Sequence, residues 1–121
     1  MNKIGRIGEK IAVKYLKKHG YKIIERNFKL KCGEIDIVAK EGEYICFIEV
    51  KTRTSNSFAE PYEAVDYKKQ KKLCRLAEIW LSMHKLHNAL CRFDIVSILL
   101  NKNCAICEIK LIKDAFWLDD V

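Results

Sequence analysis

The sequence predicts a single mixed α/β domain in which helices flank a central, mixed β-sheet, with the element order αβββαββ. Two observations carry this prediction. Apolar residues recur at helical spacing in two segments, and five shorter segments are apolar or alternating runs bounded by turn residues. The chain has 121 residues, a length that suits one hydrophobic core, so we expect residues 1–121 to form one domain.

The first helix is expected from about Gly5 to His19, with Gly20 as its C-terminal stop. Its apolar side chains form one arc, and its lysines and arginine fall on the opposite side. Glu9 departs from this division, because it projects at the border of the apolar arc, about 20° from Leu16. It is therefore not on the lysine-rich face, where a glutamate that only aids solubility would lie.

Three strands are expected after this helix, at Tyr21–Phe28, Gly33–Ala39 and Tyr44–Thr52. The residues between the last two strands, Lys40–Glu43, are typical of a hairpin turn. The third strand begins with apolar residues on both faces, which indicates a central position in the sheet.

A loop is expected at Ser55–Pro61, followed by a long helix that begins between Pro61 and Asp66 and ends near Leu86. Trp80 falls on the apolar side of this helix and is expected in the core. Two further strands are expected at Arg92–Leu100 and Ala105–Ile112, with a turn at Asn101–Asn103.

The charge balance favours an anionic partner. The chain has 23 basic and 16 acidic residues, a formal charge of +7, and nucleic acid is the commonest large anion that such a protein binds. The first residues contain no apolar signal-peptide core, and no apolar run approaches the ~18 residues that span a bilayer. We therefore expect a cytoplasmic protein with no membrane partner.

The six cysteines are expected to stay reduced in that compartment. Cys104-Ala-Ile-Cys107 is a lone CxxC motif, and a structural zinc site would need a second pair of ligands. We therefore assign no metal or redox role to it.

Charged residues interrupt two of the predicted strands. In the second strand, alternation places Asp36 on one face with Glu34 and Val38, whereas Ile35 and Ile37 point the other way. A carboxylate within an apolar strand is costly unless it is paired or bound to a metal. Asp36 is therefore a candidate for a functional role.

In the third strand, Glu49 and Lys51 share a face with Ile45 and Phe47. The predicted hairpin would bring Glu49 close to Asp36. Two converging carboxylates repel each other, and a divalent cation such as Mg²⁺, or Mn²⁺ in its place, would relieve this repulsion. Such an ion activates water and polarises a phosphate, which Lys51 would assist by stabilising the developing charge.

This arrangement suits the hydrolysis of a phosphodiester. The alternative is a strand-end aspartate beside ordinary solvent-facing residues, because a lone D…ExK pattern is frequent by chance. Two features favour the metal site: the carboxylates interrupt apolar strands, and these strands form a hairpin.

Asp36 followed by Glu49-Val50-Lys51 resembles the PD-(D/E)xK nuclease superfamily. Within it, the chain is similar to the YraN-like family of small bacterial proteins over nearly its whole length. Ala59 departs from the family pattern, which usually has glycine there. The resembling segments include Gly5-x-x-Gly8-Glu9-x-x-Ala12, Arg26-Asn27, Gly33-Glu34-Ile35-Asp36-Ile37-Val38, Phe47-Ile48-Glu49-Val50-Lys51-x-Arg53, Lys69-Gln70 and Arg92-Phe93-Asp94.

The resemblance implies a restriction-endonuclease-like core, related to that of Holliday junction resolvases. It implies that Asp36 and Glu49 are metal ligands and that Lys51 is the catalytic lysine. Glu9 matches a glutamate of the first helix that completes the metal site in resolvase-like members. Either Lys69 or Gln70 matches a further polar position that faces the site. Fold alone does not settle activity.

A basic cluster at the head of the long helix is a candidate for phosphate contacts, and its alternative is a solvated face. Together with Arg53, the expected nucleic-acid-binding residues are Lys68, Lys69, Gln70 and Lys72. Asp94 is expected to pair with Arg92 or another base in a structural role, with support of the site as the alternative.

Two functions from different classes follow. The first is a metal-dependent nuclease acting on DNA, including branched or structured forms, for which a homodimer would fit. The second is a nucleic-acid-binding or adaptor module that has the nuclease fold without turnover. The intact set Asp36, Glu49 and Lys51 favours the first.

Overall fold

The computed structural model describes residues 2–55 and 65–116. Its elements have the predicted order αβββαββ, which confirms the mixed α/β class. The helices are α1 (Lys3–Lys18) and α2 (Tyr67–Met83), and the strands are β1 (Lys22–Leu30), β2 (Gly33–Glu41), β3 (Tyr44–Thr54), β4 (Cys91–Leu100) and β5 (Ile106–Ile112).

The element boundaries differ from the predicted ones by a few residues. The expected loop at Ser55–Pro61, including Ala59, lies outside the described residues except for Ser55. Neither described helix has the length and apolar character needed to cross a membrane.

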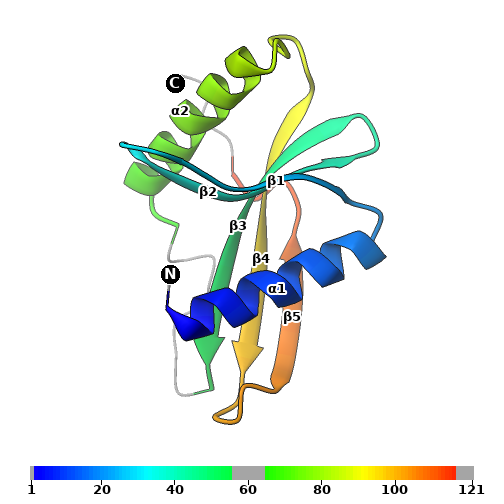
Figure 1. The fold of residues 1–121 in the computed structure, drawn as a ribbon, viewed down its shortest axis with the longest axis vertical. Helices are drawn as coiled ribbons and strands as arrows, with labels where there is room; N and C mark the ends of the chain where they lie inside the picture. The colour runs from blue at the N-terminus through cyan, green and yellow to red at the C-terminus, as the bar shows by residue number, and fades with distance from the viewer. Residues whose placement is uncertain (1, 56–64, 117–121) are drawn as a thin grey trace.

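The five strands form one sheet in the order β1-β2-β3-β4-β5. Neighbouring strands are antiparallel except β3 and β4, which are parallel and are connected through the segment that contains α2. β3 is therefore the central strand, as its apolar start predicted. Figure 1 shows α1 crossing strands β3–β5 and α2 lying near the other end of the sheet, while β1 and β2 run across the direction of β3–β5.

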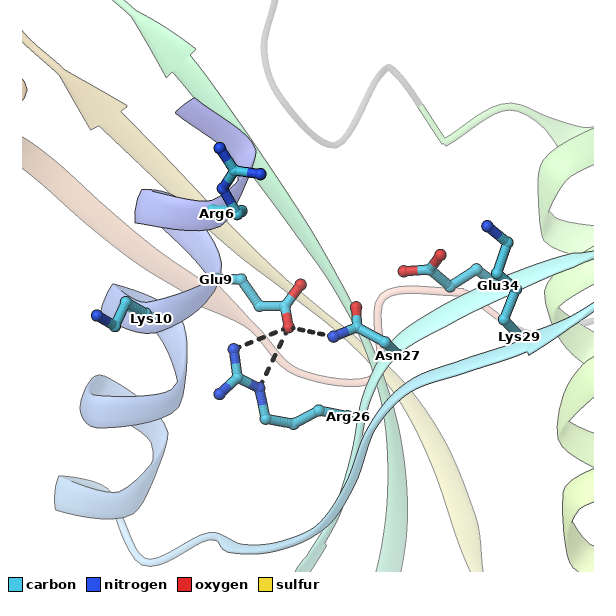
Figure 2. Close-up of a pocket in the computed structure, with 7 residues that line it drawn as sticks. All are labelled: Arg6, Glu9, Lys10, Arg26, Asn27, Lys29 and Glu34. Carbon is cyan, nitrogen blue, oxygen red and sulfur yellow. Dashed lines mark hydrogen bonds and ion pairs between the residues drawn. The ribbon is translucent and has the colours of Figure 1, made fainter. Parts of the chain in front are cut away.

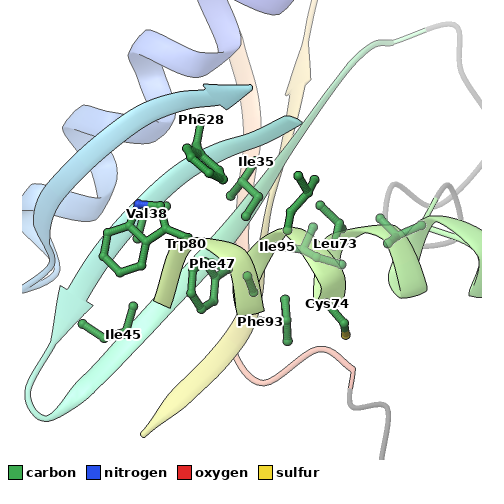
Figure 3. Packing of buried hydrophobic residues seen from close by; sticks show 13 residues of the cluster. Phe28, Ile35, Val38, Ile45, Phe47, Leu73, Cys74, Trp80, Phe93 and Ile95 are labelled. Atoms are coloured by element: carbon green, nitrogen blue, oxygen red, sulfur yellow. The ribbon is translucent and has the colours of Figure 1, made fainter. Parts of the chain in front are cut away.

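Each face of the sheet carries its own apolar core. On the α2 side, Trp80 is 1% exposed and meets the ring of Phe47 edge-on, with 5.8 Å between ring centroids (Figure 3). Its indole Nε1 donates a hydrogen bond to Glu25 at 2.9 Å, so the buried ring leaves no polar atom unsatisfied. On the α1 side, Ala12 and Leu16 pack against strands β2, β3 and β4.

Polar caps fix where both helices begin. The Asn2 side chain accepts a hydrogen bond from the backbone N–H of Gly5 at 2.7 Å, and the Asp66 side chain accepts one from that of Lys69 at 2.8 Å. Each satisfies an N–H group that the first turn of a helix leaves without a partner. The cap at Asp66 determines which residues of α2 reach the sheet.

One predicted feature of β2 is wrong. Ile35 packs in the α2-side core with Phe28 and Val38, whereas Ile37 packs in the α1-side core, so the two isoleucines do not share a face. The alternation shifts at Asp36, because the pairing of β2 with β3 ends at Ile37. β2 continues beyond this point paired with β1 alone.

Candidate functional site

Asp36 lies where β2 and β3 separate. Its Oδ2 accepts a hydrogen bond from the backbone N–H of Val50 at 2.8 Å. The last backbone pair of the ladder joins Ile37 to Ile48, so the carboxylate supplies the acceptor that a strand partner would otherwise provide. This bond holds Asp36 against the part of β3 that carries Glu49 and Lys51.

The four predicted site residues come together in one pocket. Glu9 from α1, Asp36 from β2, and Glu49 and Lys51 from β3 all line a cavity of about 280 Å³. The start of α1 and Thr52 form the rest of its wall. Residues far apart in the sequence therefore supply three carboxylates and one ammonium group to a single small space.

Glu9 is only 2% exposed, as its position on the helical wheel suggested. Its Oε1 accepts three hydrogen bonds, from Arg26 Nε at 3.2 Å, Arg26 Nη2 at 3.0 Å and Asn27 Nδ2 at 2.9 Å (Figure 2). Its Oε2 is buried and has no hydrogen-bond partner among the described residues. An unsatisfied carboxylate oxygen is costly in the interior, and Glu9 lines the same pocket as the carboxylates of Asp36 and Glu49.

Arg26 and Asn27 were not predicted as site residues, although both belong to the segments that resemble the YraN-like family. Consecutive strand residues normally point to opposite faces, yet both side chains reach Glu9. Asn27 has a φ of 56°, the left-handed conformation that asparagine tolerates better than most residues. This local turn of the backbone explains how two consecutive residues bind one carboxylate. The alternation of side chains along a strand does not predict it.

Lys69 completes the site from α2. Its Nζ donates to Glu49 Oε1 at 2.9 Å, and Lys51 Nζ lies 3.6 Å from the same oxygen. Gln70 instead donates its side-chain N–H to the carbonyl of Val65 at 2.9 Å. Of the two candidates at the start of the helix, Lys69 is therefore the one that contacts a carboxylate of the pocket.

The pocket shifts the pKa of three groups. Burial and the nearby Glu49 carboxylate raise the pKa of Asp36 to about 7, although the Val50 hydrogen bond opposes this shift. Burial and the hydrogen bond with Lys69 lower the pKa of Lys51. Burial alone would lower the pKa of Lys69, but its hydrogen bonds with Lys51 and Glu49 raise it. Lys69 is therefore the cation that neutralises Glu49.

The donor set suits a hard divalent cation, but the carboxylates do not already surround one position. Within residues 2–55 and 65–116, no three His, Cys, Asp or Glu side chains are grouped so that they would hold one metal ion. Glu49 is directed to the ammonium groups of Lys69 and Lys51. The unpaired Glu9 Oε2 and the raised pKa of Asp36 are both features that a bound cation would relieve.

Comparison with known proteins identifies the family. The model of the family described as "Uncharacterised protein family UPF0102" matches residues 8–98. The chain belongs to this family. UPF0102 proteins of Clostridium kluyveri and Caldicellulosiruptor saccharolyticus are each 48% identical to it, over 115 and 118 residues. These alignments cover 95% and 96% of the chain, and 94% and 100% of the two relatives.

A UPF0102 protein of Clostridium botulinum is 46% identical over 116 residues, which cover 95% of the chain and 94% of that relative. These matches confirm the resemblance to the YraN-like family seen in the sequence. The names of these relatives state no reaction.

The other predicted nucleic-acid-binding residues do not line the pocket. Lys68 and Lys72 are exposed on the first turns of α2, and Arg53 is half-buried near the end of β3. Their contact with nucleic acid stays a prediction.

Asp94 has the expected structural partners. Both of its carboxylate oxygens accept hydrogen bonds from Arg92, and Oδ2 also accepts one from the hydroxyl of Tyr21 at 2.9 Å. Arg92 also pairs with Glu41, which ties the β2–β3 hairpin to β4. The ion pair between Asp94 and Arg92 confirms the predicted pairing. Asp94 does not line the candidate site.

Proposed function

We propose that this protein is a metal-dependent nuclease that hydrolyses phosphodiester bonds of DNA, including branched or structured forms. The observation that carries the proposal is that Glu9, Asp36, Glu49 and Lys51 line one pocket. Carboxylates paired with a lysine at this spacing are the residues of PD-(D/E)xK nucleases, which the sequence resembles. The positive net charge of the chain suits a polyanionic substrate.

Asp36, Glu49 and the free Oε2 of Glu9 would hold a Mg²⁺ ion, or Mn²⁺ in its place. When bound, such an ion polarises the scissile phosphate and lowers the pKa of a coordinated water. Arg26 and Asn27 fix the Oε1 atom of Glu9, and Oε2, which has no hydrogen-bond partner among the described residues, would be the oxygen that binds the ion. Val50 fixes Asp36 in the same way through its backbone N–H.

Lys51 would act on the attacking water and on the phosphate. Its ammonium group lies 3.6 Å from Glu49 Oε1, within the same pocket. Burial and the hydrogen bond with Lys69 lower the pKa of Lys51, so its ammonium group gives up a proton more readily. Lys69 would leave Glu49 when a cation enters, and its charge would then face the substrate phosphate.

DNA cleavage tests this function. Wild-type protein and Lys51→Ala are incubated with single-stranded, duplex, flapped and four-way-junction DNA and with structured RNA, in Mg²⁺, in Mn²⁺ and with a chelator. Lys102→Ala is the matched control, because it removes an exposed lysine outside the pocket, in the turn between β4 and β5. We expect metal-dependent cutting that Lys51→Ala slows by about 10²-fold or more and that Lys102→Ala retains.

A second candidate is a nucleic-acid-binding module without turnover. The pairing of Glu49 with two lysines favours it, because this arrangement is satisfied without a metal. Under this alternative, no substrate is cut and DNA binding is equal with chelator and with Mg²⁺. Under the nuclease proposal, Asp36→Asn abolishes the effect of Mg²⁺ on DNA affinity.

A further inference from the structure

A second, larger cleft adjoins the candidate site. It has a volume of about 560 Å³ and lies between α1 and the β1–β2 hairpin (Figure 2). Glu9 lines both this cleft and the carboxylate pocket, so its side chain borders both cavities. A strand that occupies the carboxylate pocket would therefore have the cleft beside it.

The cleft is basic. α1 contributes Arg6 and Lys10, and β1 contributes Arg26 and Lys29, against the acidic residues Glu9 and Glu34. Arg26 already neutralises Glu9, so the remaining side chains leave an excess of positive charge. An anion is therefore the ligand that the cleft favours.

Arg26 lines the cleft and binds Glu9, which lines both cavities. It uses two N–H groups for Glu9, out of the five that an arginine carries, and its side chain is 43% exposed. Donors of the same guanidinium therefore face solvent in the cleft while the group holds Glu9 in place. A phosphate bound there would contact the residue that orients one of the proposed metal ligands.

We propose that this cleft binds one nucleotide, through its phosphate, of the DNA strand that passes through the carboxylate pocket. The inference rests on the proposed function, since it places the nucleotide next to the bond that is cut. The volume lies in the range of pockets that hold one small ligand, which suits a single nucleotide rather than a base pair. Arg6 and Lys10, one helical turn apart on α1, and Lys29 on β1 line the cleft and would flank this nucleotide.

The test is the affinity of the full chain for a fluorescein-labelled single-stranded 12-mer DNA, with a chelator present so that no metal contributes. The cleft variant is Lys10→Ala/Lys29→Ala. The matched control is Lys17→Ala/Lys22→Ala, which also removes one exposed lysine from α1 and one from β1, but outside the cleft. All four lysines are exposed, so both variants should fold, and circular dichroism checks this.

We expect the cleft variant to raise the Kd about tenfold and to lower the slope of log Kd against log salt by about 0.7, the contribution of one single-strand phosphate contact. The control should change the Kd less than threefold. Equal weakening of both variants, or of neither, would overturn the cleft as a binding site. Titration of ¹⁵N-labelled protein with thymidine 3′,5′-bisphosphate should shift the amide signals of Lys10 and Lys29, and shifts confined to α2 would likewise overturn it.

The outcome is separable from that of the proposed function. Loss of affinity in the cleft variant, together with no cleavage by the wild type, would support the cleft and contradict the nuclease. Cleavage by the wild type, with equal affinity of the cleft and control variants, would support the nuclease and contradict the cleft.

Discussion

Lys69 of α2 donates a hydrogen bond to the carboxylate of Glu49 in β3 at 2.9 Å. Lys51 lies farther from the same oxygen, at 3.6 Å. Glu49 is thus neutralised by a side chain from another element of the fold. A divalent cation in the pocket must compete with that side chain.

This competition predicts that Lys69→Met binds Mn²⁺ several-fold more tightly than the wild type. The substitution keeps an unbranched side chain but removes the charge that occupies Glu49. Isothermal titration of Mn²⁺ into each protein measures the change. Lys68→Met, the exposed neighbour, is the control and should leave the affinity unaltered. Equal or weaker binding by Lys69→Met would show that Lys69 does not compete for the site.

The raised pKa of Asp36 predicts an unusual dependence of the free energy of unfolding on pH. Its pKa rises from 3.8 to about 7 on folding, because of burial and the Glu49 carboxylate. Between these values the folded chain binds more protons than the unfolded chain, so the free energy of unfolding falls as pH rises. The loss is on the order of a few kcal/mol from pH 4 to pH 7 and then levels off.

Urea unfolding at a series of pH values, with a chelator present, measures this effect. Asp36→Asn keeps an acceptor for the Val50 N–H and removes the charge. The difference in unfolding free energy between Asp36→Asn and the wild type should therefore increase from pH 4 to pH 7. A difference that is constant over this range would contradict the raised pKa.

Gly8 allows α1 to approach β3 closely. A Cβ atom at this position would lie 2.8 Å from Thr52 Cβ and 2.9 Å from its Cγ2, so rotation of the threonine side chain does not remove the clash. Gly8→Ala should therefore push the helix outward and displace the adjacent Glu9. We expect a loss of about 1–3 kcal/mol in unfolding free energy, measured by urea denaturation. Unchanged stability would mean that α1 is free to move.

Two substitutions of Asn27 separate the effect of its backbone conformation on stability from the effect of its contact with Glu9. Asn27→Gly keeps access to the positive φ but deletes the hydrogen bond to Glu9, whereas Asn27→Val also disfavours the backbone conformation. We expect Asn27→Val to be less stable than Asn27→Gly by about 1–2 kcal/mol, measured by thermal unfolding. Equal stability of the two variants would argue that the left-handed conformation of residue 27 is not required.

The sequence was sufficient to predict the main part of the candidate site. Glu9 stood out because a helical wheel has a fixed period, and Asp36 and Glu49 were brought together by a hairpin with a short turn. The positions of Ile35 and Ile37 were not predictable in this way. A strand pattern assumes unbroken alternation, and the separation of β2 from β3 at Asp36 is set by the whole sheet.

The same limit applies to residues that reach the site from elsewhere. Arg26 and Asn27 act together only because Asn27 adopts a positive φ, which no sequence period reveals. The choice between Lys69 and Gln70 depended on the rotation of α2, which the Asp66 cap and the packing of Trp80 determine. Local patterns therefore identified which elements meet, but tertiary packing determined which side chains face the pocket.

The central claim is that Glu9, Asp36 and Glu49 hold one divalent cation. Isothermal titration of Mn²⁺ at pH 8 into the wild type, Asp36→Asn and Glu9→Gln tests it most directly, with Glu43→Gln as an exposed control. We predict one ion per chain, bound about tenfold or more weakly by both pocket variants and unchanged in the control. No binding by the wild type, or equal binding by all four proteins, would contradict the claim.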